Sequence, residues 1–304
     1  MSQHVSTTYT GAVPDAAPAM LPATLRLGAV HLTVSDLDRS VAFYEDSIGL
    51  RLHRREDGVA AMGVGKEDLL VLYEEPTAQR AGRHAGLYHY ALLFPSREEL
   101  ARAALRLAAT NTRIQGASDH GTHEAIYLPD PDGNGIELAA DRPRERWPRP
   151  LEYAGGPHPL DLDGLLASVD GEEPRPEAGP GLSVGHVHLH AGDLGRGLGF
   201  YRDVLGFELV TFMPGAAAFV SAGGYHHHLG INIWRGEGVP PAPAGRVGLH
   251  HWTIVLEDQE EVEAVRERVR AAGIATEERE GGGFLVRDPW EIAVLFVAAE
   301  ALAA

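Results

Sequence analysis

The sequence is rich in side chains that bind divalent metal ions. It contains 16 histidines, about twice the number expected for a chain of this length, and no cysteine. Several histidines are clustered, in the segments LYHYAL (87–92), DHG (119–121), GHVHL (185–189) and YHHH (225–228). Without cysteine, disulfides, thiolate metal sites, iron–sulfur clusters and a cysteine nucleophile are excluded. Any metal would have to be held by imidazole and carboxylate groups.

One of these clusters, GHVHL (185–189), lies in a segment that repeats an earlier part of the chain. LGAVHLTVSDL (27–37) aligns with VGHVHLHAGDL (184–194) at an offset of 157 residues, and the match continues without a gap to Gly49 and Gly206. Agreement over more than 20 residues at a fixed offset indicates duplicated units. His31 and His188 therefore occupy related positions in two copies of one structure.

Each copy shows a strand, a helix and further strands, twice in succession. In the first copy, alternating apolar residues predict strands near 30–34, 60–62, 69–73 and 87–94, helices at 36–49 and 97–109, and a hairpin at DPDGNG (130–135). In the second copy the same patterns predict strands near 184–190, 217–222, 227–234, 249–256, 283 and 292, and helices near 194–204 and 259–271. We therefore predict four βαβββ modules, two in each copy.

Composition divides the chain into four parts. Residues 1–24 mix Ser, Thr, Pro and Ala without apolar periodicity and are predicted to be a disordered tail. Residues 25–141 and 182–304 are predicted to be the two domains. Between them, residues 142–181 are rich in Pro, Gly and charge, which indicates a linker with a short helix near 160–166.

The charge balance excludes some classes of partner. Forty-three acidic and 26 basic residues give a net charge of −17, with no basic stripe for phosphate or anionic lipid. We expect neither nucleic acid nor a membrane as a partner. The longest apolar stretches have the length of strands, and the first residues lack a secretory signal pattern, so a cytoplasmic location is expected. A homo-oligomer is compatible with the sequence.

Several separated motifs, which recur along the chain in the right order, resemble one superfamily. LYHYAL (87–92), DPDGNGIE (130–137), GHVHL (185–189) and FYRDVLG (200–206) resemble the vicinal oxygen chelate superfamily of glyoxalases, bleomycin resistance proteins and extradiol dioxygenases. Through DHG (119–121) and SAGGYHHH (221–228), the chain is most similar to the CatE-like catechol 2,3-dioxygenases. The resemblance covers residues from about 27 to 298.

This resemblance implies an α+β fold in which pairs of βαβββ modules form open, cup-shaped barrels around a divalent metal. In the family, the ligands are a His from the first strand of one module and a His and a Glu from the first and last strands of its partner. Ring-cleaving members use iron(II), and manganese(II) is the alternative. A set of two His and one carboxylate suits iron(II) because it leaves the opposite face of the ion open.

Matching the family's ligand positions leaves one complete set. The first strands of the four modules place Ala29, His89, His186 and His251 at these positions. The last strand of module two supplies Glu137, whereas module four has Leu295. The set His89, Glu137 and His186 requires modules two and three to pair across the domain boundary, which is our prediction. Modules one and four would then form an empty, structural cup.

The alternative is pairing within the second copy, with His186, His251 and Glu291 as ligands.

The resemblance also implies three catalytic side chains, for which we choose His227, His120 and Tyr127. His226 and His228 remain alternatives to His227. The competing interpretations are an exposed polar tract or adventitious metal binder for residues 226–228 and a core aromatic for Tyr127. His31 and His188 are expected to be buried structural histidines.

These positions imply an extradiol ring-cleaving dioxygenase that opens a catechol-type aromatic diol with non-haem iron(II) and O2, as in aromatic compound catabolism. His227 would act as the acid/base, while His120 and Tyr127 would orient a substrate oxygen. A glyoxalase I-like lyase or isomerase is one alternative, although residues 229–234 lack the second carboxylate that it would use. A metal-free small-molecule-binding protein on the same scaffold is the other.

Overall fold

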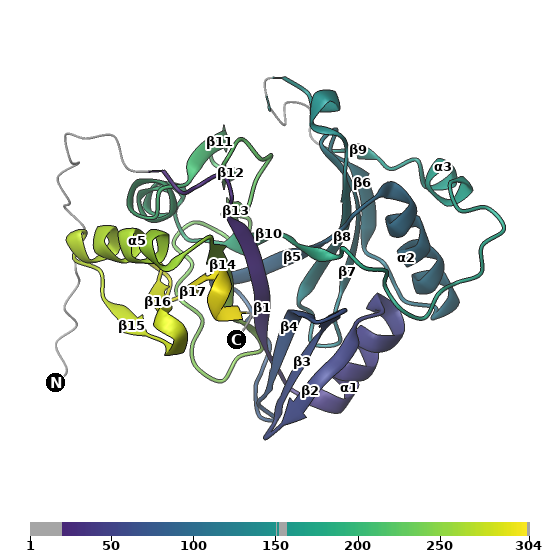
Figure 1. Cartoon of the computed structure of the whole chain (residues 1–304), viewed down its shortest axis with the longest axis horizontal. Helices are drawn as coiled ribbons and strands as arrows, with labels where there is room; N and C mark the ends of the chain where they lie inside the picture. The colour runs from purple at the N-terminus through teal and green to yellow at the C-terminus, as the bar shows by residue number, and fades with distance from the viewer. Residues whose placement is uncertain (1–19, 150, 152–156, 303–304) are drawn as a thin grey trace.

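Four modules, each with a strand, a helix and three further strands, follow one another along the chain (Figure 1). The computed structural model describes residues 20–149, 151 and 157–302. Module one consists of β1 (Arg26–Val34), α1 (Leu37–Phe43), β2 (Arg51–Glu56), β3 (Val59–Val64) and β4 (Glu67–Glu74). Module two consists of β5 (Gly86–Phe94), α2 (Arg97–Ala109), β6 (Gly116–Asp119), β7 (His123–Pro129) and β8 (Gly135–Asp141). The predicted α+β fold of tandem modules is confirmed.

The second copy repeats this order. Module three consists of β10 (Ser183–His190), α4 (Leu194–Leu198), β11 (Glu208–Met213), β12 (Ala217–Ser221) and β13 (Leu229–Asn232). Module four consists of β14 (Gly248–Leu256), α5 (Gln259–Ala271), β15 (Thr276–Glu278), β16 (Phe284–Arg287) and β17 (Ala293–Ala298). In modules one and three, the helix continues into a π-helical turn, at Tyr44–Ile48 and Gly199–Val204.

The helix of every module begins at a side chain that caps it. Asp36, Ser96, Asp193 and Asp258 each accept a hydrogen bond from the backbone N–H three residues later. Such a cap satisfies one of the N–H groups that the first turn leaves without a partner. The cap therefore fixes where the helix of each module starts.

The first strands pair across the two copies. β5 of module two is antiparallel to β10 of module three, and β1 of module one is antiparallel to β14 of module four. The described strands form one continuous sheet that curves into two cups, with these four strands at the centre of Figure 1 and α2 and α5 on the outer sides. The expected crossed pairing of modules two and three is therefore the arrangement in the structure.

Within each copy, a buried tyrosine ties one module to the next. The Tyr44 hydroxyl donates to Asp130 Oδ2 at 3.1 Å, and the Tyr201 hydroxyl donates to Asp288 Oδ2 at 2.9 Å. Asp130 also accepts hydrogen bonds from the backbone N–H groups of Asp132 and Asn134. These bonds hold the turn from which β8 starts, and β8 carries Glu137.

The predicted tail and linker contain some packed residues. Most of the tail, residues 1–19, lies outside the described residues, but the Leu21 side chain is buried and its amide donates to the Gly206 carbonyl. Residues 142–181 include a short 3₁₀ turn (Arg144–Arg146), β9 (His158–Pro159), which pairs with β6, and α3 (Leu162–Ala167). No helix in the described ranges is long and apolar enough to cross a membrane.

Candidate metal centre

Three neighbouring strands carry the predicted metal ligands to one point. β5 is parallel to β8, with Ala91 opposite Glu137, and antiparallel to β10, with Ala91 opposite His186. His89 lies two residues before Ala91 and therefore faces the same side of the sheet as Ala91. His89, Glu137 and His186 thus all face the interior of the cup formed by modules two and three.

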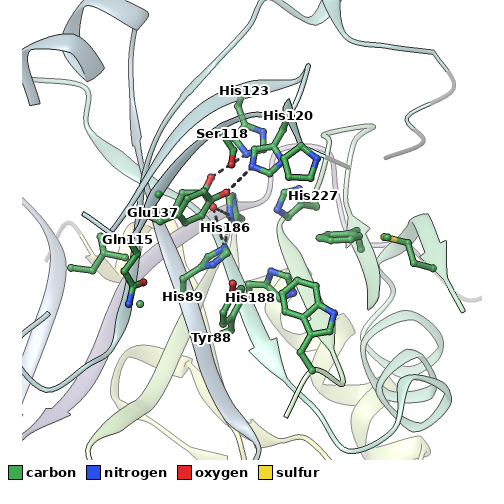
Figure 2. Close-up of a pocket in the computed structure, with 18 residues that line it drawn as sticks. Tyr88, His89, Gln115, Ser118, His120, His123, Glu137, His186, His188 and His227 are labelled. Carbon is green, nitrogen blue, oxygen red and sulfur yellow. Dashed lines mark hydrogen bonds and ion pairs between the residues drawn. The ribbon is translucent and has the colours of Figure 1, made fainter. Parts of the chain in front are cut away.

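The three side chains converge on one buried point (Figure 2). His89 Nε2 lies 3.2 Å from His186 Nε2 and 3.1 Å from Glu137 Oε2, and His186 Nε2 lies 3.2 Å from Glu137 Oε2. The exposed fractions of the side chains are 8% for His89 and 2% for the other two. Ligands about 2.1 Å from one ion and at right angles to each other are about 3.0 Å apart. The triangle therefore fits one face of an octahedral metal site.

The charge states of these groups suit metal binding. Burial opposes ionisation of Glu137, but His186, His123 and His89 outweigh it and hold the pKa of the carboxyl well below its usual range. Burial lowers the pKa of His186, against the opposite effect of Glu137. A carboxylate and a neutral imidazole are the ligand forms of these side chains.

Gly135 allows β8 to approach β5 closely enough for this geometry. A Cβ atom at this position would lie only 2.1 Å from the backbone oxygen of Tyr88. Gly135 stands opposite His89 in the parallel pair, two residues before Glu137. The glycine of the DPDGNG hairpin therefore contributes to the spacing between two of the candidate ligands.

The structure brings the three predicted catalytic residues to the same cavity. The His227 ring centroid lies 4.1 Å from that of His186. Tyr127 stands opposite Glu137 on β7, and its hydroxyl lies 2.7 Å from His120 Nε2. Burial and the neighbouring His123 lower the pKa of His120 to about 4. All three side chains line the cavity that holds the candidate ligands. Figure 2 shows His120 and His227 beside Glu137 and His186.

The cavity has a volume of about 410 Å³. Its lining combines imidazoles and Glu137 with an apolar, largely aromatic group that consists of Tyr88, Met213, Phe219 and Trp234. The rings of Tyr88, Phe219 and Trp234 all contact that of His188. A planar ring with polar groups on one edge would match this lining, because the ring can contact the aromatic group while its polar edge faces the ligands.

The segment 226–228 is not an exposed polar tract. His226, His227 and His228 retain only 1%, 4% and 9% of their exposed area, so this competing interpretation is wrong. The segment leaves β12 through Gly223 and Gly224, both with positive φ, and enters β13. This compact turn directs the histidines inward rather than into solvent.

The alternative ligand set is not brought together. His251 stands opposite His31 on β1, in the cup of modules one and four, and the two rings stack with centroids 3.7 Å apart. Glu291 is exposed in the turn before β17 and has a φ of 64°. Within the described part of the chain, only two groups of three or more His, Asp or Glu residues have ligand atoms that all lie within 4.8 Å of one another. They are His89–Glu137–His186 and His123–Asp141–His226.

The second of these groups was not predicted. His123 Nε2 lies 3.0 Å from Glu137 Oε1, and His123 Nδ1 lies 2.8 Å from Thr122 Oγ1. His226 Nε2 lies 3.0 Å from Asp141 Oδ1. The sequence contains a signal for His123, because it shares the inward face of β7 with Tyr127 at a spacing of four residues. His226 belongs to the cluster 225–228 and is an alternative to His227 in the sequence analysis, whereas Asp141 carries no comparable signal.

His188 is buried, as expected, but it also lines the cavity. Its ring lies against His89 and Phe219, with centroids 5.0 and 5.5 Å away. His31 is only partly buried and bonds to the Tyr73 hydroxyl. Opposite His188, β13 carries Gly230 at the position that corresponds to Glu137 on β8. Module three thus places no carboxylate at this position.

The chain matches a family model, several known proteins and several solved structures. The model of the Glyoxalase/Bleomycin resistance protein/Dioxygenase superfamily matches residues 26–138 and 183–296. A protein from Bacillus subtilis (strain 168) named catechol-2,3-dioxygenase is 44% identical over 269 residues, which cover 86% of this chain and 93% of the relative. A glutathione transferase FosA from Serratia marcescens is 30% identical over 118 residues, 37% of this chain and 78% of that protein.

Solved structures show the same fold at low sequence identity. A putative dioxygenase from Bacillus subtilis has a TM-score of 0.61 at 15% identity and covers 93% of this chain and 86% of that one. Glyoxalase I from Zea mays has a TM-score of 0.58 at 19% identity and covers 92% and 94%. These structural similarities show that the fold is shared.

Proposed function

The chain belongs to the glyoxalase/bleomycin resistance protein/dioxygenase superfamily, and within it we propose an extradiol dioxygenase that cleaves catechol-type aromatic diols with iron(II) and O2. The observation that carries this proposal is the buried triangle of His89 Nε2, His186 Nε2 and Glu137 Oε2, with edges of 3.1 to 3.2 Å. Extensive similarity to a protein named catechol-2,3-dioxygenase supports the same reaction.

His89, His186 and Glu137 would hold the iron. This donor set suits iron(II), and manganese(II) can use the same ligands. When bound, the metal would lower the pKa of a catechol hydroxyl and mediate electron transfer from the ring to O2. His123 supports the carboxylate ligand, because its Nε2 lies 3.0 Å from Glu137 Oε1. Such contacts orient a metal ligand and increase its basicity.

The other side chains of the cavity would bind the diol and move its protons. Burial lowers the pKa of His227 well below its usual value, so the ring is neutral and can accept a proton from a hydroxyl. Tyr127 and His120 form a hydrogen-bonded pair that can hold a substrate oxygen. Phe219 and Trp234 would contact the ring and exclude water from it.

A glyoxalase-like lyase is less compatible with this site. Such an enzyme would use a second carboxylate, and the corresponding position of module three is Gly230. Replacing this glycine would be difficult, because an added Cβ would lie 2.9 Å from the His188 ring.

The test is oxygen uptake by anaerobically purified protein reconstituted with iron(II). We expect catechol to consume equimolar O2 and to give a yellow ring-opened semialdehyde, and a chelator to abolish the reaction. Reconstitution with manganese(II) in parallel distinguishes the two metals. Ligand binding that is insensitive to chelator, without oxygen uptake, would instead identify a metal-free binding protein.

A further inference from the structure

Three side chains beside the candidate ligands form a hydrogen-bonded chain that ends at His227. Asp141 Oδ1 lies 3.0 Å from His226 Nε2, and His226 Nδ1 lies 2.8 Å from His227 Nδ1. We propose that this chain fixes the tautomer of His227, with the proton on Nδ1 and the lone pair on Nε2. Asp141 and His226 are then positioning residues. The role of this tautomer in catalysis rests on the proposed function, whereas the assignment of the tautomer does not.

The direction of the chain follows from which atoms can donate. An ionised carboxylate only accepts hydrogen bonds, so His226 Nε2 must donate to Asp141. A neutral imidazole carries one N–H, so His226 Nδ1 can only accept. His227 Nδ1 must therefore be the donor across the 2.8 Å contact. This assignment leaves Nε2 as the unprotonated nitrogen of His227.

The charge states support this direction. Burial opposes ionisation of Asp141, but the hydrogen bond from His226 and the charges of His226 and His123 outweigh it and lower the pKa of the carboxyl. Burial lowers the pKa of His226 to about 3, although Asp141 acts in the opposite direction. Asp141 is thus ionised and His226 neutral near pH 7.

The surroundings of His226 hold its ring in the orientation that the chain requires. The ring lies between those of His123 and Tyr225, with centroids 4.7 and 4.1 Å away and interplanar angles of 14° and 34°. Trp147 contacts it edge-on at 5.2 Å. Rotation of this imidazole would break the hydrogen bonds at both of its nitrogens. The packing therefore keeps the direction of both hydrogen bonds fixed.

The tautomer matters because His227 lines the cavity. A base must offer a lone pair to the hydroxyl whose proton it accepts. With the proton on Nδ1 and held by His226, the Nε2 atom can accept a proton from the diol and return it later. With the opposite tautomer, Nε2 would carry a hydrogen and could not act as the base.

A second metal ion is the other candidate for the atoms of His123, Asp141 and His226. Contacts with neighbouring side chains account for these atoms without an ion. Both nitrogens of His226 face partners within 3.0 Å, and the His123 nitrogens face Glu137 Oε1 and Thr122 Oγ1. The three side chains therefore support the predicted centre instead of forming a new one.

The direct test is ¹⁵N NMR of histidine-labelled, chelator-treated protein, because protonated and unprotonated ring nitrogens have well-separated shifts. We expect the His227 proton on Nδ1. In Asp141→Asn, the amide can donate to His226 Nε2, which reverses both hydrogen bonds and moves the His227 proton to Nε2. Asp141→Glu should restore the original tautomer. His226→Phe keeps the stacked ring but removes both nitrogens, and should give a mixture of tautomers.

Kinetics of the iron(II) enzyme give the second readout. A wrong tautomer in a hydrogen-bonded triad can cost about 10⁴-fold in turnover, so we expect Asp141→Asn to lower kcat by about 10² to 10⁴ with little change in KM. Asp141→Glu should recover to within about tenfold. The matched control is Glu124→Gln, which removes a buried carboxylate paired with Arg97 and Arg142. It should change neither the tautomer nor kcat.

Two results would overturn the inference: a wild-type His227 with its proton on Nε2, or an Asp141→Asn protein with the wild-type tautomer. A correct tautomer in a wild-type protein that does not consume O2 with catechol would leave this inference standing. That result would reject the proposed function alone.

Discussion

At the level of single residues, Glu137 distinguishes the two ligand sets. Glu137→Gln keeps the shape of the side chain but removes the negative ligand, so we expect the affinity for iron(II) to fall by more than about 100-fold. The matched control is Glu291→Gln, which changes an exposed carboxylate outside this cup and should leave the affinity unchanged. Metal analysis after anaerobic reconstitution measures both. Weaker iron(II) binding in Glu291→Gln but not in Glu137→Gln would support the ligand set within the second copy.

The convergence of His89, Glu137 and His186 could be predicted because the resemblance to the superfamily gives the ligand positions on its strands, and the repeat locates those positions in each module. Comparing the four modules with one another shows which of them lack a ligand residue at the corresponding position, as at Ala29 and Leu295. His226 and Asp141 could not be predicted in this way. They meet only because the turn after β12 folds against the end of β8, which is a contact between segments 85 residues apart.

At the level of elements, helices were predicted better than strands. α2 and α5 span the predicted residues 97–109 and 259–271, because a capping side chain marks the start and the apolar period marks the length. The positions of β2, β6, β11 and β15 were not predicted. These strands have no fully buried residue, so their sequences lack the alternation that identifies a half-buried strand.

The close approach of β8 to β5 gives a prediction for Gly135. In Gly135→Ala, the new methyl group would meet the Tyr88 carbonyl, and overpacking of this kind costs about 1 to 3 kcal/mol. We expect a lower free energy of unfolding and weaker iron(II) binding, because Glu137 would move relative to His89. Gly199→Ala is the control, since a Cβ there has no neighbour within 4 Å. Urea unfolding measures the stability and metal titration measures the iron(II) affinity. Equal results for the two variants would contradict the prediction.

The Tyr201–Asp288 contact predicts a pH dependence of stability. Burial raises the pKa of Asp288 to about 7, against the hydrogen bonds that it accepts from Trp290, Ile292 and Tyr201. In the unfolded chain its pKa is about 3.9. Between these values the folded state holds a proton that the unfolded state has lost, so this contribution to stability falls as the pH rises.

We therefore expect the free energy of unfolding of the wild type to fall relative to Asp288→Asn by at least about 1 kcal/mol between about pH 4 and pH 7. Asparagine cannot titrate, so the difference between the two proteins isolates this group. Urea unfolding at several pH values measures it. Asp203→Asn, which changes a solvent-exposed ion pair with Arg202, should follow the wild type. Parallel curves for wild type and Asp288→Asn would show that Asp288 is ionised throughout this range.

At the level of the whole molecule, the repeat alone could not decide how the modules pair. Two cups can be built either within or across the copies, because all four first strands have similar sequences. Counting ligand positions favoured crossed pairing, and the β5–β10 and β1–β14 ladders show that arrangement. In the second cup, His31 stacks on His251 beside Leu295, so its interior has lost the ligand set while keeping the strand pairing.

The charge of the molecule and of its cavity leads to a prediction about substrates. The chain has a net charge of −17, and the described residues that line the cavity include Glu137 but no Lys or Arg. A carboxylate on the substrate ring would enter this cavity without a cationic partner. Burial of an unpaired charge costs several kcal/mol. The cavity should therefore select diols with neutral ring substituents.

We expect 3,4-dihydroxybenzoate to have a kcat/KM at least about 100-fold below that of catechol, while 4-methylcatechol stays within about tenfold of catechol. The methyl group tests size at the same ring position, so the comparison isolates charge. Gln115 lines the cavity, and Gln115→Lys should narrow the gap for the carboxylated diol by providing a cation. Oxygen uptake under identical iron(II) loading measures all three diols. If the wild type used the carboxylated diol as well as catechol, charge in the cavity would not determine which diols the protein accepts.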